Sequence, residues 1–577
     1  MVKIEKLNYG RPEKELYKDV SFELVEDAHY AFIGTNGTGK STLIDMILNP
    51  TEYLYKGKIE LDESVRNTRI GYVSQFDTMD DSADMTVFDY ISAEFTAIEN
   101  KIAQLCDRMA TETDLEAVFD EYQRVLDEKD SIDGDNYDIN IRKQLAIAGL
   151  EKLENHKISS LSGGEFKLVQ VIKELLLSPK LLFMDEPDVF LDFERINALK
   201  ELINAHKGTI VVITHNRFLL NHCFDHILHL ENSDVQVFEG SYVEYNIELL
   251  STKVELLEIA AREDEEIARQ QEILNKARAL ATYMDNASLG RQVHARQTIV
   301  DRLKDRKTKL PFIDIRKPKM EFAFAEPMEC ETALSLKGYE AAFDEQLLSD
   351  VSFDIAVGDK VAIIGRNGTG KTTLLKDIAE AKKSSISFGE GALVRMFSQS
   401  IRSDEEDDKS VKDMLLANGM ELISEMEKFL GYFGFPEEAL HKRMKDFSGG
   451  ERDLLKLAFL TVANSNFLIL DEPTGHLDVY DQVSLENAVR DYKGTVLIVS
   501  HDFYTVVNCV DYVLFVENNS IRRMSVRKFR QMIYENYFDK NYLLKEDKRK
   551  ELELQINSKI SKKDFETAKE LLEKIEA

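Results

Sequence analysis

The stretches GTNGTGKS (residues 34–41) and GRNGTGKT (residues 365–372) decide the fold of this chain. Both match the pattern G-x-x-x-x-G-K-[ST], and each directly follows an apolar run, HYAFI or KVAII. A strand, a glycine-rich loop and a helix start surround phosphate groups with backbone N–H donors and with the positive end of the helix dipole. One such octamer is compatible with a chance glycine-rich turn, but two copies behind two apolar strands indicate two phosphate-binding loops.

The two loops predict a set of nucleotide-binding residues. Lys40 and Lys371 are expected to reach the β- and γ-phosphates, and Ser41 and Thr372 to bind Mg²⁺. The full set comprises Gly34, Thr35, Asn36, Gly37, Thr38, Gly39, Lys40, Ser41 and Thr42 in the first half, and Gly365, Arg366, Asn367, Gly368, Thr369, Gly370, Lys371, Thr372 and Thr373 in the second.

Further motifs repeat in the same order in both halves of the chain. They are DVSFEL and DVSFDI, LSGGE (161–165) and FSGGE (447–451), LLFMDEP (181–187) and FLILDEP (467–473), and VVITH (211–215) and LIVSH (497–501). The phosphate-loop lysines are 331 residues apart, but Ser162 and Ser448 are only 286 apart. Because Gln75 and Gln399 are 324 apart, the first half has 38 extra residues between its glutamine and its SGGE. The sequence therefore predicts two copies of one α/β domain, with an insertion in the first copy only.

Each DEP sequence ends an apolar strand, which brings two carboxylates to the sheet edge beside the phosphate loop. The first carboxylate of each pair is expected to hold Mg²⁺. The second, Glu186 or Glu472, is expected to polarise the attacking water. An acidic helix cap after a strand would explain one acid, but not a pair that recurs between SGGE and a strand-ending histidine. The residues predicted for the metal sites are Ser41, Gln75, Asp185, Thr372, Gln399 and Asp471.

His215 and His501 each close a strand rich in valine and isoleucine. A lone histidine there is more often a core residue, but the duplicate placement favours a catalytic contact with the γ-phosphate.

The SGGE motif predicts an anion site at a helix start, too far along the chain to serve its own phosphate loop. The two domains are therefore expected to pair head to tail, each closing over the other's nucleotide with Ser162, Gly163 and Gly164 or with Ser448, Gly449 and Gly450.

Composition limits the classes of partner. A formal net charge of −31 excludes general binding of nucleic acid or anionic membranes. No run approaches the length of a membrane-spanning segment, the N-terminus does not resemble a signal peptide, and the four cysteines have no metal-ligand spacing. A cytoplasmic protein is expected.

One dense basic stretch interrupts this acidic chain. Residues 276–309 contain nine Lys or Arg and three Asp. They belong to a region, 241–320, that is predicted to form two antiparallel helices broken at ASLG (287–290). Basic residues often only solvate a helix face. The position of this stretch between the two domains instead favours local contact with RNA, with Arg291, Arg296 and Arg302 as candidates.

The order of phosphate loop, Gln, SGGE, DEP and His resembles the ATP-binding cassette superfamily. This resemblance implies two shared ATP sites with Mg²⁺, and an aromatic residue that stacks on each adenine, for which Tyr9 and Tyr339 are candidates. Tandem cassettes joined by a helical hairpin, without a membrane part, resemble the ABC-F family. That family implies ATP hydrolysis, binding at the ribosomal exit-tRNA site, action near the peptidyl-transferase centre on rRNA and tRNA, and a helical arm in the first cassette.

The predicted organisation is a first cassette at 1–240 with the arm at about 95–135, a hairpin linker at 241–320, a second cassette at 321–540 and a helical C-terminal extension at 541–577. The resemblance implies a monomer whose cassettes pair within the chain, and a role either in protection from antibiotics or in relief of stalled translation. Two rival hypotheses are a tandem ATPase that energises a separate membrane permease and a DNA-repair or chromosome ATPase.

The chain departs from the family pattern in places. The family's EPTNHLD is EPTGHLD at 472–478 but EPDVFLD at 186–192, which is expected to affect hydrolysis at the first site and to make the two sites unequal. The arm region 98–135 has twelve acidic and four basic residues, which favours a protein contact or a spacer over RNA. The C-terminal extension is expected to form two helices broken near Ser561, either packed on the second cassette or free to touch the ribosome.

Overall fold

A computed structural model describes residues 1–11, 14–66, 68–75, 83–111, 115–284, 287–305, 318, 320–342, 346–398, 408–537 and 542–576. The chain divides into two compact units. The first unit contains both cassettes, Met1–Ser241 and Arg316–Ile533. The second contains Tyr242–Ile315 and Tyr534–Ala577.

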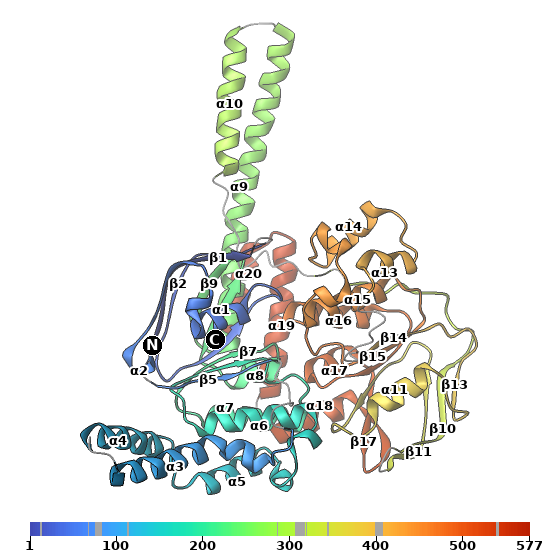
Figure 1. Ribbon diagram of the computed structural model, residues 1–577. Coiled ribbons are helices and arrows are strands. Elements are labelled where there is room, and N and C mark those ends of the chain that lie inside the picture. The colour runs from blue at the N-terminus through green and yellow to red at the C-terminus, as the bar shows by residue number, and fades with distance from the viewer. Residues whose placement is uncertain are drawn as a thin grey trace. The chain divides into compact units, whose positions relative to one another are not determined.

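The first cassette is built from two sheets (Figure 1). The antiparallel sheet has the order β2-β1-β4, and the six-stranded sheet has the order β5-β6-β7-β3-β8-β9, parallel except for the edge strand β9. The strands are β1 (Val2–Arg11), β2 (Lys14–Leu24), β3 (His29–Ile33), β4 (Lys56–Leu61), β5 (Ile70–Val73), β6 (Leu181–Asp185), β7 (Thr209–Ile213), β8 (His226–Glu231) and β9 (Asp234–Glu239). Its helices are α1 (Lys40–Leu48), α2 (Glu63–Arg66), α3 (Val87–Thr111), α4 (Leu115–Ser131), α5 (Tyr137–Ile147), α6 (Gly163–Leu176), α7 (Phe193–Ala205) and α8 (Arg217–His222).

The second cassette repeats this plan. Its sheets have the orders β11-β10-β13 and β14-β15-β16-β12-β17-β18. The strands are β10 (Thr332–Ala342), β11 (Gln346–Ala356), β12 (Lys360–Ile364), β13 (Ile386–Phe388), β14 (Val394–Ser398), β15 (Phe467–Asp471), β16 (Thr495–Val499), β17 (Tyr512–Glu517) and β18 (Ser520–Ser525). The helices are α11 (Lys371–Ala379), α13 (Val411–Ala417), α14 (Ile423–Tyr432), α15 (Gly449–Val462), α16 (Val479–Asp491), α17 (Phe503–Cys509) and α18 (Val526–Tyr537). The predicted α/β fold of two tandem cassettes is confirmed.

The apolar runs of the sequence become the central parallel strands. Every residue of β6, β7, β15 and β16 is buried, as expected for strands covered on both faces. In the first cassette, α1 and the antiparallel sheet pack over the six-stranded sheet, with Tyr17, Phe32, Leu43 and Phe183 in the shared core. In each cassette, the DEP sequence and the strand-ending histidine follow the carboxyl ends of two neighbouring parallel strands. They therefore lie at the same edge of the six-stranded sheet.

The 38 extra residues of the first cassette fall where α3 and α4 lie. These helices pack against each other through Leu105, Val118 and Val125, all buried. Phe119 and Leu115 of α4 are more than half exposed, at 57% and 54%. Among the residues that the structure describes, the α-helices in the corresponding region of the second cassette are the short α13 and α14.

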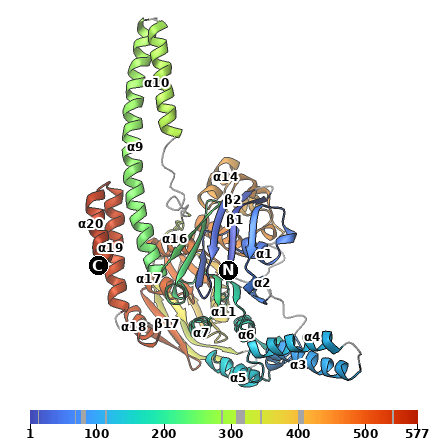
Figure 2. The same ribbon diagram turned by 90° about the vertical axis from the view of Figure 1, so that its left-hand side faces the viewer.

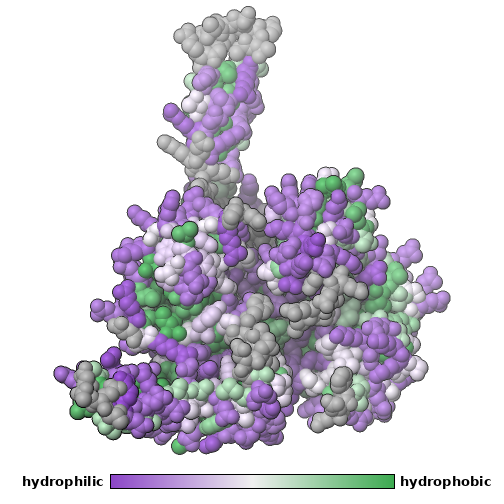
Figure 3. All heavy atoms as spheres, in the orientation of Figure 1, coloured by the Kyte–Doolittle hydropathy of each residue, from purple (hydrophilic) through white to green (hydrophobic). Residues whose placement is uncertain are grey.

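The second unit is helical. α9 (Tyr242–Met284) and α10 (Ala287–Asp305) form an antiparallel pair (Figure 2) with Leu274 and Val300 buried. The prediction that ASLG breaks the helices is wrong, because α10 already begins at Ala287. The face of this pair that Figure 3 shows is mainly hydrophilic where its residues are described.

The C-terminal extension forms α19 (Tyr542–Ser561) and α20 (Phe565–Glu576), so the predicted break near Ser561 is confirmed. Both helices belong to the second unit, where they pack on the first part of α9. The contact buries Val254 of α9 with Ile556 and Leu571, and Lys569 Nζ lies 2.7 Å from Glu258 Oε2. The extension therefore packs against the linker.

Candidate functional site

The phosphate loops have the shape that their glycines predict. In the first loop Gly39 has φ 105°, and α1 begins at the next residue, Lys40. The ammonium group of Lys40 turns back onto the loop and donates to the carbonyl oxygens of Gly34 (2.9 Å) and Thr35 (3.0 Å). Lys371 makes the same two bonds to Gly365 and Arg366, each of 2.7 Å. Two backbone carbonyl oxygens of each phosphate loop therefore hold the ammonium group of its lysine.

The predicted Mg²⁺ residues of each cassette lie together. Ser41 lies close enough to Asp185 to influence the pKa of its carboxyl group, and Thr372 Oγ1 lies 3.3 Å from Asp471 Oδ1. Burial raises the pKa of Asp185 to about 6, and burial also raises the pKa of Asp471. Asp185 Oδ1 is buried and has no hydrogen-bond partner in the described part of the chain. A hydroxyl and a desolvated carboxylate are ligands that Mg²⁺ prefers, so these residues fit the ion.

The cassettes pair head to tail, as predicted. The backbone N–H of Asn36 donates to Asp478 Oδ2 (3.0 Å), and that of Asn367 donates to Asp192 Oδ2 (3.1 Å). The side-chain amides of the same asparagines donate to the carbonyl oxygens of His476 (2.8 Å) and Phe190 (2.9 Å). Asp192 and Asp478 therefore cross from one cassette to the phosphate loop of the other.

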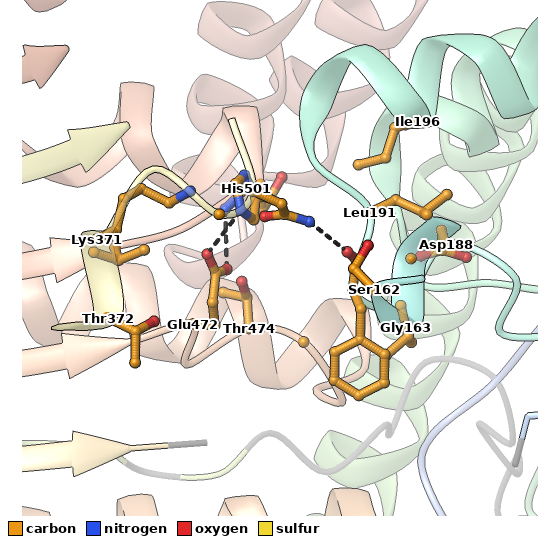
Figure 4. Close-up of a pocket in the computed structure, with 18 of the residues that line it drawn as sticks. Ser162, Gly163, Asp188, Leu191, Ile196, Lys371, Thr372, Glu472, Thr474 and His501 are labelled. Carbon is orange, nitrogen blue, oxygen red and sulfur yellow. Dashed lines mark hydrogen bonds and ion pairs between the residues drawn. The ribbon is translucent and has the colours of Figure 1, made fainter. Parts of the chain in front are cut away.

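Each SGGE motif caps a helix and faces the opposite phosphate loop. Ser162 and Ser448 are the N-caps of α6 and α15, each in a capping box with the following glutamate. A cavity of about 510 Å³ is lined by Ser162, Gly163 and Gly164 of the first cassette and by Lys371, Thr372, Glu472 and His501 of the second (Figure 4). In the other site, Gly450 lies directly against Asn36 of the first phosphate loop. A Cβ added at Gly450 would lie only 2.9 Å from Asn36 Nδ2.

The two catalytic glutamate candidates have different surroundings. Glu186 Oε2 accepts a 2.5 Å hydrogen bond from Gln75 Nε2 and lies 3.6 Å from Nδ1 of His476. Burial alone would raise the pKa of Glu186, but the neighbouring His476, His215 and Lys40 lower it. This carboxylate is kept ionised.

Glu472 has only partners from its own cassette among the contacts that the structure describes. His501 donates its backbone N–H to Oε2 (3.1 Å), and His501 Nε2 lies 3.2 Å from Oε1. Burial raises the pKa of Glu472 to about 7. Gln399, the counterpart of Gln75, lies outside the described residues.

The two strand-ending histidines differ in the same way. Nε2 of His215 is buried and has no hydrogen-bond partner in the described residues, so it is available to a phosphate oxygen. His501 is instead engaged with Glu472. Burial lowers the pKa of His215 to about 4 and that of His501 to about 3, which keeps both imidazoles neutral near pH 7.

One adenine-stacking candidate is wrong. Tyr339 is completely buried, its hydroxyl donates to Asp377 (2.8 Å) and Lys383 Nζ lies over its ring, so it has no free face for a base. Tyr9 is half-buried, and its ring packs on Tyr17 and edge-on to Tyr53. Its role in adenine binding stays a prediction.

Sequence reasoning missed a buried ion pair between the cassettes. The guanidinium of Arg217 in α8 contacts Glu486 of α16 and Asp502, with 2.5 Å between its Nη2 and Asp502 Oδ2. Arg217 follows the predicted His215 by two residues, but no motif marks it. Only the fold reveals that the other cassette supplies its partners.

The RNA-contact candidates lie on α10 in the second unit. Arg296 is exposed and donates to Gln270 Oε1 of α9 (3.3 Å), and Arg302 is also exposed. Neither forms an ion pair with any residue that the structure describes. The side chain of Arg291 lies outside the described part.

Comparisons with known proteins agree with this geometry. The profile of the ABC transporter family matches residues 17–189 and 348–475. Similar proteins include the Energy-dependent translational throttle protein EttA of Haemophilus influenzae, 29% identical over 87% of this chain and 89% of its own length. The ABC transporter F family member 2 of Arabidopsis thaliana is 27% identical over 90% of this chain and 77% of its own length.

Among solved structures, the fold resembles an archaeal ribosome recycling factor, aABCE1, in complex with ribosomal stalk protein aP1. The TM-score is 0.56 at 18% identity, over 93% of this chain and 92% of that one. Among the described helices, none combines the length and apolar character that crossing a bilayer requires.

Proposed function

Because the chain belongs to the ABC transporter family and, within it, to the ABC-F family of tandem cassettes, we propose that this ATP-hydrolysing enzyme acts on the translating ribosome. ATP with Mg²⁺ binds at both composite sites, closes the cassettes and lets the protein bind at the exit-tRNA site. Hydrolysis removes the γ-phosphate contacts and releases it. The protein acts as a monomer in the cytoplasm.

The observation that carries this proposal is the reciprocal pairing of the cassettes. Asp478 and Asp192 bind the phosphate loops of the opposite cassettes, and SGGE motifs face both loops. A γ-phosphate placed between a phosphate loop and the facing SGGE would join two parts of one chain. Bound ATP would then hold the two cassettes together, and its hydrolysis would weaken their pairing. A protein that binds a large partner and later releases it requires such a change.

The ribosome is favoured as the partner by the relatives and by the linker. One relative is named a translational throttle protein. The exposed Arg296 and Arg302 give an otherwise acidic chain a local contact for phosphate groups of rRNA or tRNA. We place their target near the peptidyl-transferase centre, where the protein either protects the ribosome from an antibiotic or relieves a stall.

The proposal is tested with the double variant Glu186→Gln, Glu472→Gln. It should bind ATP without hydrolysing it, sediment with ribosomes in ATP and inhibit translation in vitro. The matched control adds Lys40→Ala and Lys371→Ala, which remove the phosphate-binding ammonium groups and should abolish cosedimentation. A double variant that stays free of ribosomes in ATP, or that fractionates with membranes, would contradict the proposal.

Growth of a host that expresses the wild-type protein, on several inhibitors of the peptidyl-transferase centre, separates the two physiological roles. Increased resistance to an inhibitor supports protection. Unchanged resistance together with altered recovery from stalls supports the role in elongation.

A further inference from the structure

The two ATP sites receive different residues at one position of the motif that follows the catalytic glutamate. In EPTGHLD (472–478) this position is His476, and in EPDVFLD (186–192) it is Phe190. Both residues lie at the boundary between the cassettes, where their carbonyl oxygens accept the side-chain amides of Asn36 and Asn367. Each therefore serves the site of the opposite cassette.

We infer that His476 of the second cassette positions the catalytic carboxylate Glu186 of the first, and that the second site lacks this residue because Phe190 stands in its place. The inference rests on the proposed ATPase function. It predicts that the first site hydrolyses ATP faster than the second.

The contacts at the first site support a positioning role. The His476 side chain is 10% exposed, and its Nδ1 lies 3.6 Å from Glu186 Oε2. Gln75 Nε2 donates to the same oxygen, so the glutamate is held from both cassettes. In the part of the chain that the structure describes, Nε2 of His215 has no hydrogen-bond partner and can contact the γ-phosphate.

The groups around His476 favour its charged form. Glu186, Asp188 and Asp453 face it and together raise the pKa of its imidazole, although burial opposes them. Asp188 stands where the second cassette has Thr474, and it accepts a 2.7 Å hydrogen bond from Thr214. The substitution of Asp for Thr in the first motif therefore adds a carboxyl group, whose pKa burial raises to about 7, beside a histidine that comes from the other cassette.

The second site shows the converse arrangement. Phe190 has no group that can donate a hydrogen bond to a carboxylate. Its ring packs edge-on against that of His476, with 5.9 Å between the ring centroids. Glu472 turns instead to His501 of its own cassette. The histidine that would contact the γ-phosphate is thereby engaged with the glutamate.

This geometry changes the interpretation of the sequence departures. The missing histidine of EPDVFLD was expected to affect the first site, but the residue at this position acts across the boundary. Its loss concerns the second site, whereas the Thr-to-Asp change at 188 stays within the first cassette.

The test measures each site separately. Glu472→Gln leaves the first site active and Glu186→Gln leaves the second, and His476→Phe is introduced into both backgrounds. We expect His476→Phe to lower kcat at least about tenfold in the Glu472→Gln background with KM changed less than about twofold, since a misplaced catalytic group affects the chemical step. The factor by which His476→Phe lowers kcat should be about tenfold larger in the Glu472→Gln background than in the Glu186→Gln background.

Two further variants separate positioning from folding. His476→Gln retains an N–H donor and should recover part of the lost kcat. His441→Phe, the same change at an exposed position of the second cassette, should retain the parent rate. Equal losses in both backgrounds, a loss confined to the second site, or a raised KM with unchanged kcat would overturn the inference. Because these assays contain no ribosomes, a failure of ribosome binding leaves their outcome untouched.

Discussion

At the scale of single residues, the phosphate loop depends on a glycine that no other residue replaces. Gly39 has φ 105°, and a Cβ there would lie 2.8 Å from the hydroxyl of Tyr17. That hydroxyl already donates to the Gly39 carbonyl oxygen at 2.5 Å, and Tyr17 is completely buried. A side chain at position 39 must therefore displace the loop or the core beneath it.

Gly39→Ala should consequently weaken ATP binding at the first site by at least about tenfold, because the loop moves away from the phosphates. Titration of a fluorescent ATP analogue in the Lys371→Ala background, where the second site lacks its phosphate-binding ammonium group, measures this. Gly358→Ala is the matched control, since Gly358 is also left-handed, with φ 88°, but has open space around its Cβ position. Equal affinity in both variants would contradict the role given to Gly39.

The buried Arg217 makes a second prediction at this scale. Arg217→Met leaves Glu486 and Asp502 without their cation and should lower the free energy of unfolding by about 3 kcal/mol. Urea denaturation measures the change. Arg490→Met is the control, because the side chain of Arg490 is 57% exposed and contacts its exposed neighbour Asp491 and the nearby Asn487.

The same ion pair predicts a pH dependence. Burial alone would raise the pKa of Asp502, but Arg217 and the hydrogen bonds to Thr505 and Tyr504 lower it overall. A carboxylate with a lowered pKa in the folded state stabilises above its ordinary pKa of about 4, and this stabilisation is lost as the pH falls through the lowered value. In Arg217→Met, burial without the opposing charge raises the pKa of Asp502, so the stability difference between wild type and variant should be largest at alkaline pH and shrink as the pH falls and the carboxyl is protonated.

At the scale of elements, the basic helix α10 is the candidate contact with RNA. Arg296→Ala with Arg302→Ala should weaken ribosome binding most at low salt, because the dependence of log affinity on log salt should become less steep by about two. The control, Arg262→Ala with Lys276→Ala, removes two charges of α9 that already pair with Glu258 and Glu272. If both pairs of substitutions have the same effect, the contact is not specific to α10.

The packing of α20 on α9 is a second element-scale feature. Leu571→Ala should destabilise this cluster by about 2 to 3 kcal/mol and speed amide hydrogen exchange in α19 and α20. Leu554→Ala, the same change at a position that is 73% exposed, should not. Unchanged exchange in the Leu571 variant would mean that the extension is held elsewhere.

At the scale of the whole molecule, repetition made most of the fold predictable. The paired motifs gave both cassettes, and the offset between Gln75 and Ser162 located the insertion where α3 and α4 lie. The head-to-tail pairing followed from the distance between each SGGE and its own phosphate loop. These predictions succeed because a motif with a fixed chemical task constrains its place in the fold.

Other features depend on contacts that no local pattern carries. Tyr339 matched a family position, but strand β10 turns its ring into the core. The place of the C-terminal extension was left open, because amphipathic helices do not specify which apolar face they cover. His476 lay within a recognised motif, yet its contact with Glu186 depends on how two domains meet, 290 residues apart in the chain.

The most direct test of the whole account is the amount of ATP retained by the Glu186→Gln, Glu472→Gln variant after it has sedimented with ribosomes. The account predicts two ATP molecules per chain in the ribosomal pellet and loss of the protein from the pellet when ADP replaces ATP. Ribosome binding that is the same in ADP, or that occurs without retained ATP, would contradict it.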